Sequence, residues 1–223
     1  MEAKIRRQQV MADARRAMVL AAAKEVFTRV GLERASIREI AKQAGYTPGA
    51  LYAYFASKQA LLAAIQEDLL NRLEAFVQQA KLPKGQTDQA VLQKGRAWMA
   101  FFISQPRDLE LTLFLLVGAG NMGMASETSQ RLHRQMRQTL APLANALAAL
   151  GASAAQAETE MEALLAHGLG LLLAQDPGRL QVAEQSPEAL FDRYLQDLTR
   201  RYQVSATDRR ATQVAIPQVD LFG

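Results

Sequence analysis

Residues 36–58, with the sequence SIREIAKQAGYTPGALYAYFASK, constrain the fold of this chain more than any other stretch. Ser36 is a good N-cap for a short helix whose apolar positions fall on one face. Gly45 supplies the backbone freedom that commonly ends a helix. Thr47 can cap a second helix that begins at Pro48, where the missing N–H costs nothing. The spacing therefore predicts two short helices joined by a tight turn.

A helix-turn-helix of this kind is typical of proteins that read double-stranded DNA. The second helix lies in the major groove, while the first crosses the backbone, so residues 47–54 are the candidate readers. Charge agrees with this interpretation, because residues 1–72 hold 12 Lys and Arg against 7 Asp and Glu, whereas the remainder holds 14 against 15. Basic side chains would neutralise phosphates, although an ordinary solvated surface can show the same excess.

Helical patterning extends through the rest of the chain. Its 223 residues are 49% hydrophobic, and the apolar positions recur at helical rather than alternating spacing. We therefore predict an all-α protein with helices at about 13–30, from about 61 to 80, and at about 88–104, 107–117, 126–150, 154–174 and 187–202. There is no cysteine, so no disulfide or thiolate metal site can form. No apolar run reaches the length needed to span a membrane.

The ordered motif in the first third of the chain resembles the DNA-binding domain of the tetracycline-repressor (TetR) family of bacterial regulators. The matching residues are Ser36, Arg38, Ile40, Ala41, Ala44, Gly45, Leu51, Tyr52, Tyr54, Phe55, Lys58, Leu61 and Leu62. The resemblance implies an N-terminal three-helix DNA-binding domain followed by a larger helical effector-binding and dimerisation domain. It also implies a cytoplasmic homodimer, more often a repressor, that releases a palindromic operator when a small molecule binds. No cofactor and no enzymatic activity are expected.

The same resemblance assigns the DNA contacts. Those expected at phosphates, which position the protein without specifying a sequence, are Ser36, Arg38, Tyr52, Tyr54 and Lys58. The positions expected to face the bases are Thr47, Pro48, Gly49, Ala50 and Ala53. Because these five offer little side-chain hydrogen bonding, specificity must depend on Thr47, on Arg38, on Ala or Pro contacts with thymine methyl groups and on DNA shape.

We predict four segments in the chain: a basic N-terminal arm over 1–12, the helix-turn-helix domain over 13–62, the effector and dimerisation domain over 63–204, and a C-terminal tail over 205–223. The basic residues at the N-terminus could form an arm that reaches a minor groove; they are Lys4, Arg6, Arg7, Arg15 and Arg16. A disordered, solvated leader is the favoured interpretation of this segment, because chain termini are commonly poorly ordered.

Large apolar side chains in the second half of the chain could line an effector cavity for an apolar or amphipathic compound. The candidates are Trp98, Phe101, Phe102, Phe114, Met122, His133 and Met136, although residues at this helical spacing are equally ordinary core. By resemblance, the last two long helices form the dimer interface, with candidates His167, Gly168, Leu171, Tyr194 and Leu198. These could instead be buried within one subunit.

Two short motifs favour other functions. Residues 118–123 spell the G-x-G-x-x-G dinucleotide fingerprint, but no strand precedes it and no acidic residue stands at the required distance, which argues against a nucleotide-dependent enzyme. His133 and His167 are the only histidines, and no metal-binding or catalytic motif contains them. The C-terminal Gln218, Val219, Asp220, Leu221 and Phe222 resemble the peptide with which bacterial proteins dock on the sliding clamp. A helical protein-interaction factor is therefore the alternative function.

Overall fold

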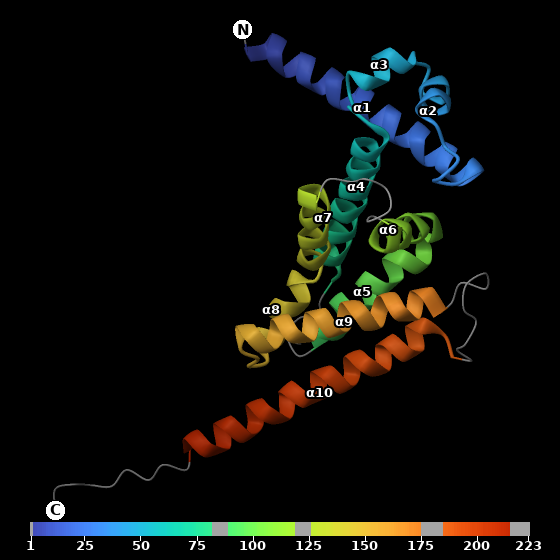
Figure 1. Ribbon diagram of the computed structural model, residues 1–223. Helices are drawn as coiled ribbons and strands as arrows, with labels where there is room; N and C mark the ends of the chain where they lie inside the picture. Colours follow the sequence, from blue (N-terminus) through green and yellow to red (C-terminus); the bar gives the residue numbers. More distant parts are fainter. Residues whose placement is uncertain (1, 82–88, 119–125, 175–184, 215–223) are drawn as a thin grey trace, which may run out of the picture. The chain divides into compact units, whose positions relative to one another are not determined.

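The computed structural model describes residues 2–81, 89–118, 126–174 and 185–214, without the side chains of 2–4, 114–118 and 204–214 (Figure 1). Every regular element in these ranges is an α-helix, which confirms the all-α prediction. The chain divides into two compact units. The first unit consists of Met1–Leu70 and Glu110–His133, and the second consists of Asn71–Leu109 and Arg134–Gly223. The division at 70/71 lies inside a helix, eight residues beyond the boundary that the sequence suggests.

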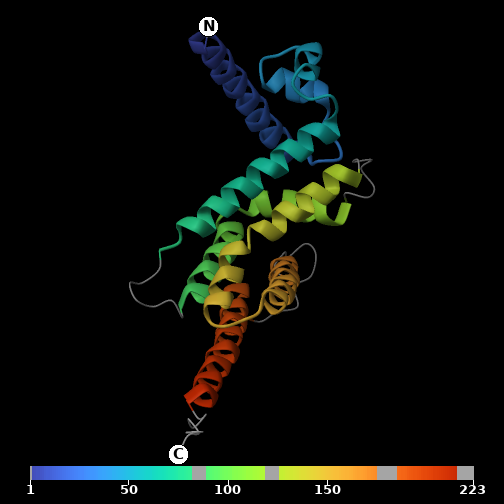
Figure 2. The same cartoon turned by 90° about the vertical axis from the view of Figure 1, so that its left-hand side faces the viewer.

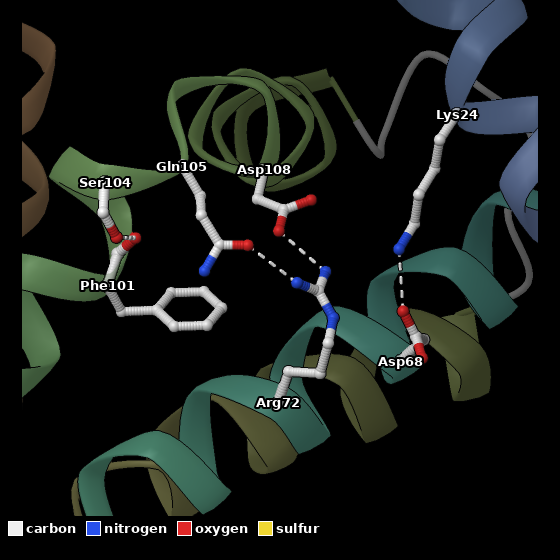
Figure 3. Close-up of polar contacts among 7 residues, drawn as sticks. All are labelled: Lys24, Asp68, Arg72, Phe101, Ser104, Gln105 and Asp108. Atoms are coloured by element: carbon white, nitrogen blue, oxygen red, sulfur yellow. Dashed lines mark hydrogen bonds and ion pairs between the residues drawn. The ribbon is translucent and has the colours of Figure 1, made fainter. Parts of the chain in front are cut away.

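The first unit contains the three helices expected at the N-terminus. They are α1 (Glu2–Val30), α2 (Ile37–Gln43) and α3 (Pro48–Tyr52), followed by the beginning of α4 (Lys58–Gln79). α1 packs against α2, and α2 against α3, around side chains with no exposed surface: Val19, Ala23, Val26, Ile40, Ala41, Leu51, Leu62 and Ile65. An ion pair of 2.7 Å between Lys24 Nζ and Asp68 Oδ2 links α1 to α4 (Figure 3). Burial of the apolar stripes supplies most of the stability of such short helices.

The N-terminal segment differs from the prediction. Residues 2–12, for which a disordered leader was favoured, belong to α1, which begins eleven residues before the expected start at 13. The physical reason combines composition with continuity. Residues 2–18 contain Ala, Arg, Gln and Met in number and neither Gly nor Pro, so nothing in this stretch interrupts a helix that is anchored by its second half.

The second unit is built around α5 (Ala90–Ser104). This helix packs against α8 (Ala141–Ala149), α9 (Ala154–Ala174) and α10 (Pro187–Val214), and α9 also contacts α8 and α10 (Figures 1 and 2). The unit further contains the end of α4, the start of α6 (Pro106–Gly118) and the end of α7 (Ser126–Gln138). Its core is aromatic: Trp98 lies 5.0 Å from Phe102 and 6.0 Å from Phe191 between ring centroids.

Two helix boundaries in this part of the chain were predicted wrongly. The single helix expected over 126–150 is interrupted at Thr139 and Leu140, because Pro142 has no N–H to donate to the Gln138 carbonyl four residues earlier and its ring would clash with that carbonyl. The last helix does not end at Tyr202 but continues to Val214, so residues 205–214 are not an irregular tail. No Gly or Pro occurs between Pro187 and Val214 to stop it earlier.

Hydrogen bonds of polar side chains in the second unit hold the C-terminal part of α4. Arg72 donates to Gln105 Oε1 at 2.8 Å and to Asp108 Oδ2 at 2.7 Å, at the corner between α5 and α6 (Figure 3). Lys94 of α5 is only 8% exposed. Its Nζ donates at 3.0 and 2.7 Å to the carbonyl oxygens of Val77 and Gln78 at the end of α4, and at 2.9 Å to that of Ala80 just beyond it. The last carbonyls of a helix have no partner within it, and the ammonium group helps to satisfy them here, together with the Ala80 N–H, which donates to the Val77 carbonyl at 3.3 Å.

Several sequence motifs lie outside the described residues. They include most of the glycine motif at 118–123 and the four clamp-like residues Gln218, Asp220, Leu221 and Phe222. Within the described ranges, no helix is long and apolar enough to cross a lipid bilayer. The same ranges contain no group of three or more His, Asp or Glu side chains that could hold a metal ion.

Candidate nucleic-acid interface

Helix α2 is fixed at its beginning by a reciprocal cap. Ser36 Oγ accepts a hydrogen bond of 3.2 Å from the Glu39 backbone N–H, and Glu39 Oε2 accepts one of 3.3 Å from the Ser36 N–H. This is the capping box, which satisfies two backbone donors that the first turn of a helix leaves free. Ser36 Oγ also donates to Glu39 Oε2 at 3.2 Å. The hydroxyl is therefore already engaged within the protein.

The turn between α2 and α3 depends on Gly45. Its φ of 74° lies in the left-handed region, which costs little only for glycine. The Tyr46 N–H donates to the Ala41 carbonyl at 2.8 Å and the Gly45 N–H to the Lys42 carbonyl at 3.2 Å. Together these bonds form a Schellman motif, which closes the end of α2. The predicted glycine stop is confirmed.

Helix α3 begins as the sequence predicts. Thr47 is its N-cap, and Thr47 Oγ1 accepts a hydrogen bond of 3.2 Å from the Ala50 N–H, while Pro48 occupies the first turn. Leu51 has no exposed surface and Phe55 only 3%, so these two side chains anchor the helix on the core of the unit. A capping hydroxyl contributes about 1 kcal/mol to such a helix. The orientation of α3 is thus fixed by one cap and two buried anchors.

The outer face of α3 is exposed, and apart from Tyr52 its side chains are small. Thr47, Pro48, Gly49, Tyr52 and Ala53 are exposed, and Ala50 is half-buried. Tyr52 is 53% exposed, and a Cβ built on Gly49 would meet nothing within 4 Å. A helix with such small side chains can approach the floor of a major groove closely, where its apolar atoms can contact thymine methyl groups.

The residues expected at phosphates divide into two groups. Arg38 and Tyr52 are exposed, and among the described residues no carboxylate lies within ion-pair distance of Arg38. Tyr54 is half-buried, with its ring 6.2 Å from that of Tyr46. Lys58 is also half-buried, and its Nζ donates to the Glu33 carbonyl at 3.2 Å. Burial lowers the pKa of Lys58 from its ordinary value, while the charge of Glu33 opposes that shift.

One further cation belongs to this surface. Lys42 is exposed on α2, one helical turn after Arg38, and residues four apart lie on the same face of a helix. The spacing alone could have identified it, because the sequence already places both residues opposite the apolar stripe. Arg38 and Lys42 give α2 a pair of positive charges for the backbone that this helix crosses.

The structure buries most of the residues proposed for an effector cavity. Trp98 and Phe102 have no exposed surface, and Phe101 and Met136 have 2% each. Trp98 Nε1 donates to Thr139 Oγ1 at 3.3 Å, so the polar atom of the indole has a partner inside the core. His133 is exposed on α7, whereas the side chain of Phe114 and all of Met122 lie outside the described residues. The four buried members thus pack in the core of the second unit.

An open groove of about 500 Å³ occurs elsewhere in the second unit. It lies along α7, α8 and α9, with an apolar lining that consists mainly of alanines and Met161. The charged groups at its rim are Arg134 and Arg137 from α7 and Glu158 and Glu162 from α9. Small side chains on adjacent helices leave this space open. The sequence-based prediction considered large apolar residues and therefore missed it.

The residues proposed for a dimer interface differ in how deeply they are buried in the chain's own second unit. Leu198 has no exposed surface, and Gly168 packs within the chain, because a Cβ on it would lie 2.7 Å from Trp98 Cζ3. Both therefore serve the core of the chain's own second unit. Leu171 is half-buried on α9. The rings of His167 and Tyr194 stack with 4.6 Å between centroids.

His167 is half-buried on α9. Its Nε2 is buried and makes no hydrogen bond to any described residue. Burial lowers the pKa of His167 below its ordinary value, and a hydrogen bond to the Leu190 backbone opposes the shift. The neutral ring is therefore the form that this packing favours.

Comparison with known proteins agrees with the geometry of the first unit. Residues 19–65 match the family model described as bacterial regulatory proteins, tetR family. The uncharacterized HTH-type transcriptional regulator YvdT of Bacillus subtilis (strain 168) is 52% identical over 52 residues, which cover 23% of this chain and 27% of YvdT. That match thus spans about a quarter of the relative's length.

Other relatives extend the likeness beyond the first unit. The HTH-type transcriptional regulator BetI of Escherichia coli O139:H28 is 29% identical over 178 residues, covering 71% of this chain and 91% of BetI. The crystal structure of a transcriptional regulator from Rhodococcus sp. Rha1 has a TM-score of 0.66 and 25% identity, and the alignment covers 83% of this chain and 96% of that one. Both the reading helices and the larger helical part are thus similar to those of known regulators.

Proposed function

Because this chain belongs to the tetR family of bacterial regulatory proteins, we propose that it binds a specific operator as a homodimer in the cytoplasm and represses transcription there. The outer face of α3 carries the proposal. It is exposed from Thr47 to Ala53 apart from its buried anchor Leu51 and half-buried Ala50, and the hydrogen bonds that hold it lie within the unit. Such a preorganised face loses little conformational entropy when it enters a major groove.

Roles within the interface follow from exposure and chemistry. Arg38 and Lys42 contact phosphates where α2 crosses the DNA backbone, and the Tyr52 hydroxyl donates a hydrogen bond to a phosphate of the same DNA strand. Thr47 keeps a hydroxyl hydrogen and a lone pair for a base edge after capping α3. Pro48 and Ala53 contact thymine methyl groups. Ser36, Tyr54 and Lys58 position the helices, because their polar atoms or rings are engaged within the protein.

Selection of bound sequences from a random duplex pool at physiological salt tests this function. We expect enrichment of a palindromic site, and we expect Arg38→Ala and Tyr52→Ala each to weaken binding to it by a factor of about ten or more, the size of a lost charged contact. Arg193→Ala, an exposed change on α10, is the matched control. The proposal is overturned if the wild-type chain enriches no sequence.

A dimer is proposed because two-fold operators are read by two copies about 34 Å apart, one turn of DNA. α9 offers an exposed surface for this contact, with Ala163, Ala166 and Gly170 on one side of the helix, and His167 and Tyr194 border it. Sedimentation of the purified chain would test the assembly. A monomer at micromolar concentration that still protects a palindrome as two independent halves would contradict it.

The groove along α7, α8 and α9 supports an amphipathic effector. Its alanine-rich floor suits an apolar body, and the charged groups at its rim suit a polar end. We infer that a compound bound there lowers operator affinity. Straight-chain carboxylic acids and alkylamines of six to twelve carbons are suitable probes, tested for operator release by fluorescence anisotropy.

A groove-filling variant separates this site from other binding sites. Ala144→Phe places a ring in the groove and leaves the first unit unchanged. We expect it to bind the operator normally and to lose its response to any probe that releases the wild-type chain. A variant that still responds would place the effector elsewhere.

A further inference from the structure

The first half of α1 is a helix that the rest of the chain does not cover. Every side chain from Ile5 to Met18 is exposed, and the first buried residue of the helix is Val19, with no exposed surface. Four large apolar side chains lie in this free segment, defined as residues 5–18: Ile5, Val10, Met11 and Met18 are 61%, 60%, 51% and 57% exposed. Fourteen residues of helix extend about 21 Å.

The free segment is strongly basic. It contains Arg6, Arg7, Arg15 and Arg16, and its only acidic residue is Asp13, which accepts a hydrogen bond of 3.1 Å from Gln9. Among the described residues, no carboxylate lies within ion-pair distance of these four arginines. Arg16 lies over the Phe55 ring, 5.2 Å from its centroid, so this arginine connects the free segment to the residue that anchors α3.

The free segment is continuous with the DNA-reading helices of its unit. It extends directly from the part of α1 that packs against α2. Both views show the N-terminal end of α1 reaching the same end of the first unit as α3 (Figures 1 and 2). A surface with a net charge of +3 over residues 5–18 thus lies near the face expected to meet polyanionic DNA.

We propose that the free segment of α1 binds the phosphate backbone of the DNA that flanks the operator half-site read by α3. This inference rests on the proposed function. Because the segment is helical and a helix with its side chains is about 10–12 Å wide, it cannot enter a minor groove of about 6 Å as a flexible arm would. It lies along the backbone instead, where arginines contribute affinity that is independent of sequence and sensitive to salt.

The length of the segment defines the footprint. At 3.4 Å per base pair, about 21 Å of helix follows about six base pairs beyond the bases that α3 reads. Shortening the flanks of a selected operator to the palindrome alone should therefore weaken binding of the wild-type chain. The loss should be the same for any flanking sequence.

The triple variant Arg6→Gln, Arg7→Gln and Arg15→Gln tests the proposal in the full chain. Gln keeps a high helix propensity, and circular dichroism checks that the helix remains. The slope of log Kd against log salt concentration should fall by about 0.9 for each lost phosphate contact, or about 2.7 per chain. The matched control is Arg107→Gln, Arg193→Gln and Arg200→Gln, three exposed arginines of the second unit, which should leave the slope unchanged.

The outcomes distinguish this inference from the proposed function. A triple variant with lower salt dependence and no further loss on short flanks supports the proposal. The proposal is overturned if the triple variant binds long and short operators with the same affinity and salt dependence as the wild type. In that case the loss of operator binding in Arg38→Ala still tests the proposed function separately. If the triple variant changes the oligomeric state instead, the free segment contacts a second copy and the proposal is wrong. If the wild-type chain binds no DNA, both fail together.

Discussion

Gly45 and Gly168 show how differently the two units of this protein use the same residue. Gly45 ends α2 with a φ of 74°, and a Cβ built on it would meet nothing within 4 Å. Gly168 stands inside α9 as an ordinary helical residue, but a Cβ there would lie 2.7 Å from Trp98 Cζ3 and 3.1 Å from Phe191 Cε2. The first glycine is required by the backbone and the second by a neighbouring helix.

The ways in which helix ends are capped also differ between the two units. In the first unit, Ser36 and Thr47 cap their own helices through residues three positions away. In the second unit, the end of α4 is capped by Lys94, which lies 14 to 17 residues further along the chain. The ends of the two DNA-reading helices are therefore specified by neighbours in sequence. In the second unit, Ser153 and Ser186 cap α9 and α10 in the same local way, but the end of α4 is specified by a neighbour in space. Four measurements test this difference between the two units.

The largest effect is expected for Gly168→Ala compared with Gly170→Ala. The first change forces a methyl group against the buried indole of Trp98 and should lower the free energy of unfolding by about 2 kcal/mol. The second adds the same methyl group two residues later, where nothing of the same chain lies within 4 Å, and should raise the stability of the separate subunit by up to about 1 kcal/mol. Urea denaturation measures both. Equal values would remove the close-packing role of Gly168.

Lys94→Met should have the next largest effect. The change removes the ammonium group from three carbonyls at and just beyond the end of α4 while it keeps a long apolar stem, and we expect a loss of about 2 kcal/mol in the free energy of unfolding. The exposed Lys81→Met is the control and should change little. Hydrogen exchange should also become faster in the last turn of α4. Unchanged exchange there would mean that Lys94 is dispensable as a cap.

Gly45→Ala is expected to cost about 1 kcal/mol, because an L residue in the left-handed region is strained even where space is open. Gly49→Ala is the matched control, since its surroundings are equally open and it lies within a helix. Thermal unfolding of the two variants gives the comparison. A loss in Gly45→Ala no larger than in the control would show that the turn tolerates other conformations.

The smallest effect is expected from the protonation of His167. Because burial lowers its pKa in the folded chain, the unfolded state binds the proton more readily, and stability should fall as the pH drops through the ordinary histidine pKa of about 6.5. Above that value both states are neutral and the contribution is complete. Unfolding temperatures at pH 8 and pH 5.5 should differ less in His167→Gln than in the wild type, and an equal difference would contradict this role of His167.

This division also explains what could be predicted from the sequence. The caps at Ser36 and Thr47, the glycine stop at Gly45 and the helix over 154–174 depend on residues close in sequence, and the structure confirms them. Local patterns could not show that Trp98 and Phe102 fill a core rather than a cavity, since apolar spacing is the same in both cases. Nor could they show the free helical segment at the N-terminus, because stability there comes from its continuity with the packed half of α1.

The passage of the chain between its two units limits how the protein can be divided. The boundaries at 70/71, 109/110 and 133/134 fall inside α4, α6 and α7, so each of the three crossings is a helix rather than a linker. A fragment ending at Leu70 would cut α4 between Leu69 and Leu73, both fully buried. The DNA-reading part is therefore not a portable module, and swapping it between regulators requires junctions that preserve three helices at once.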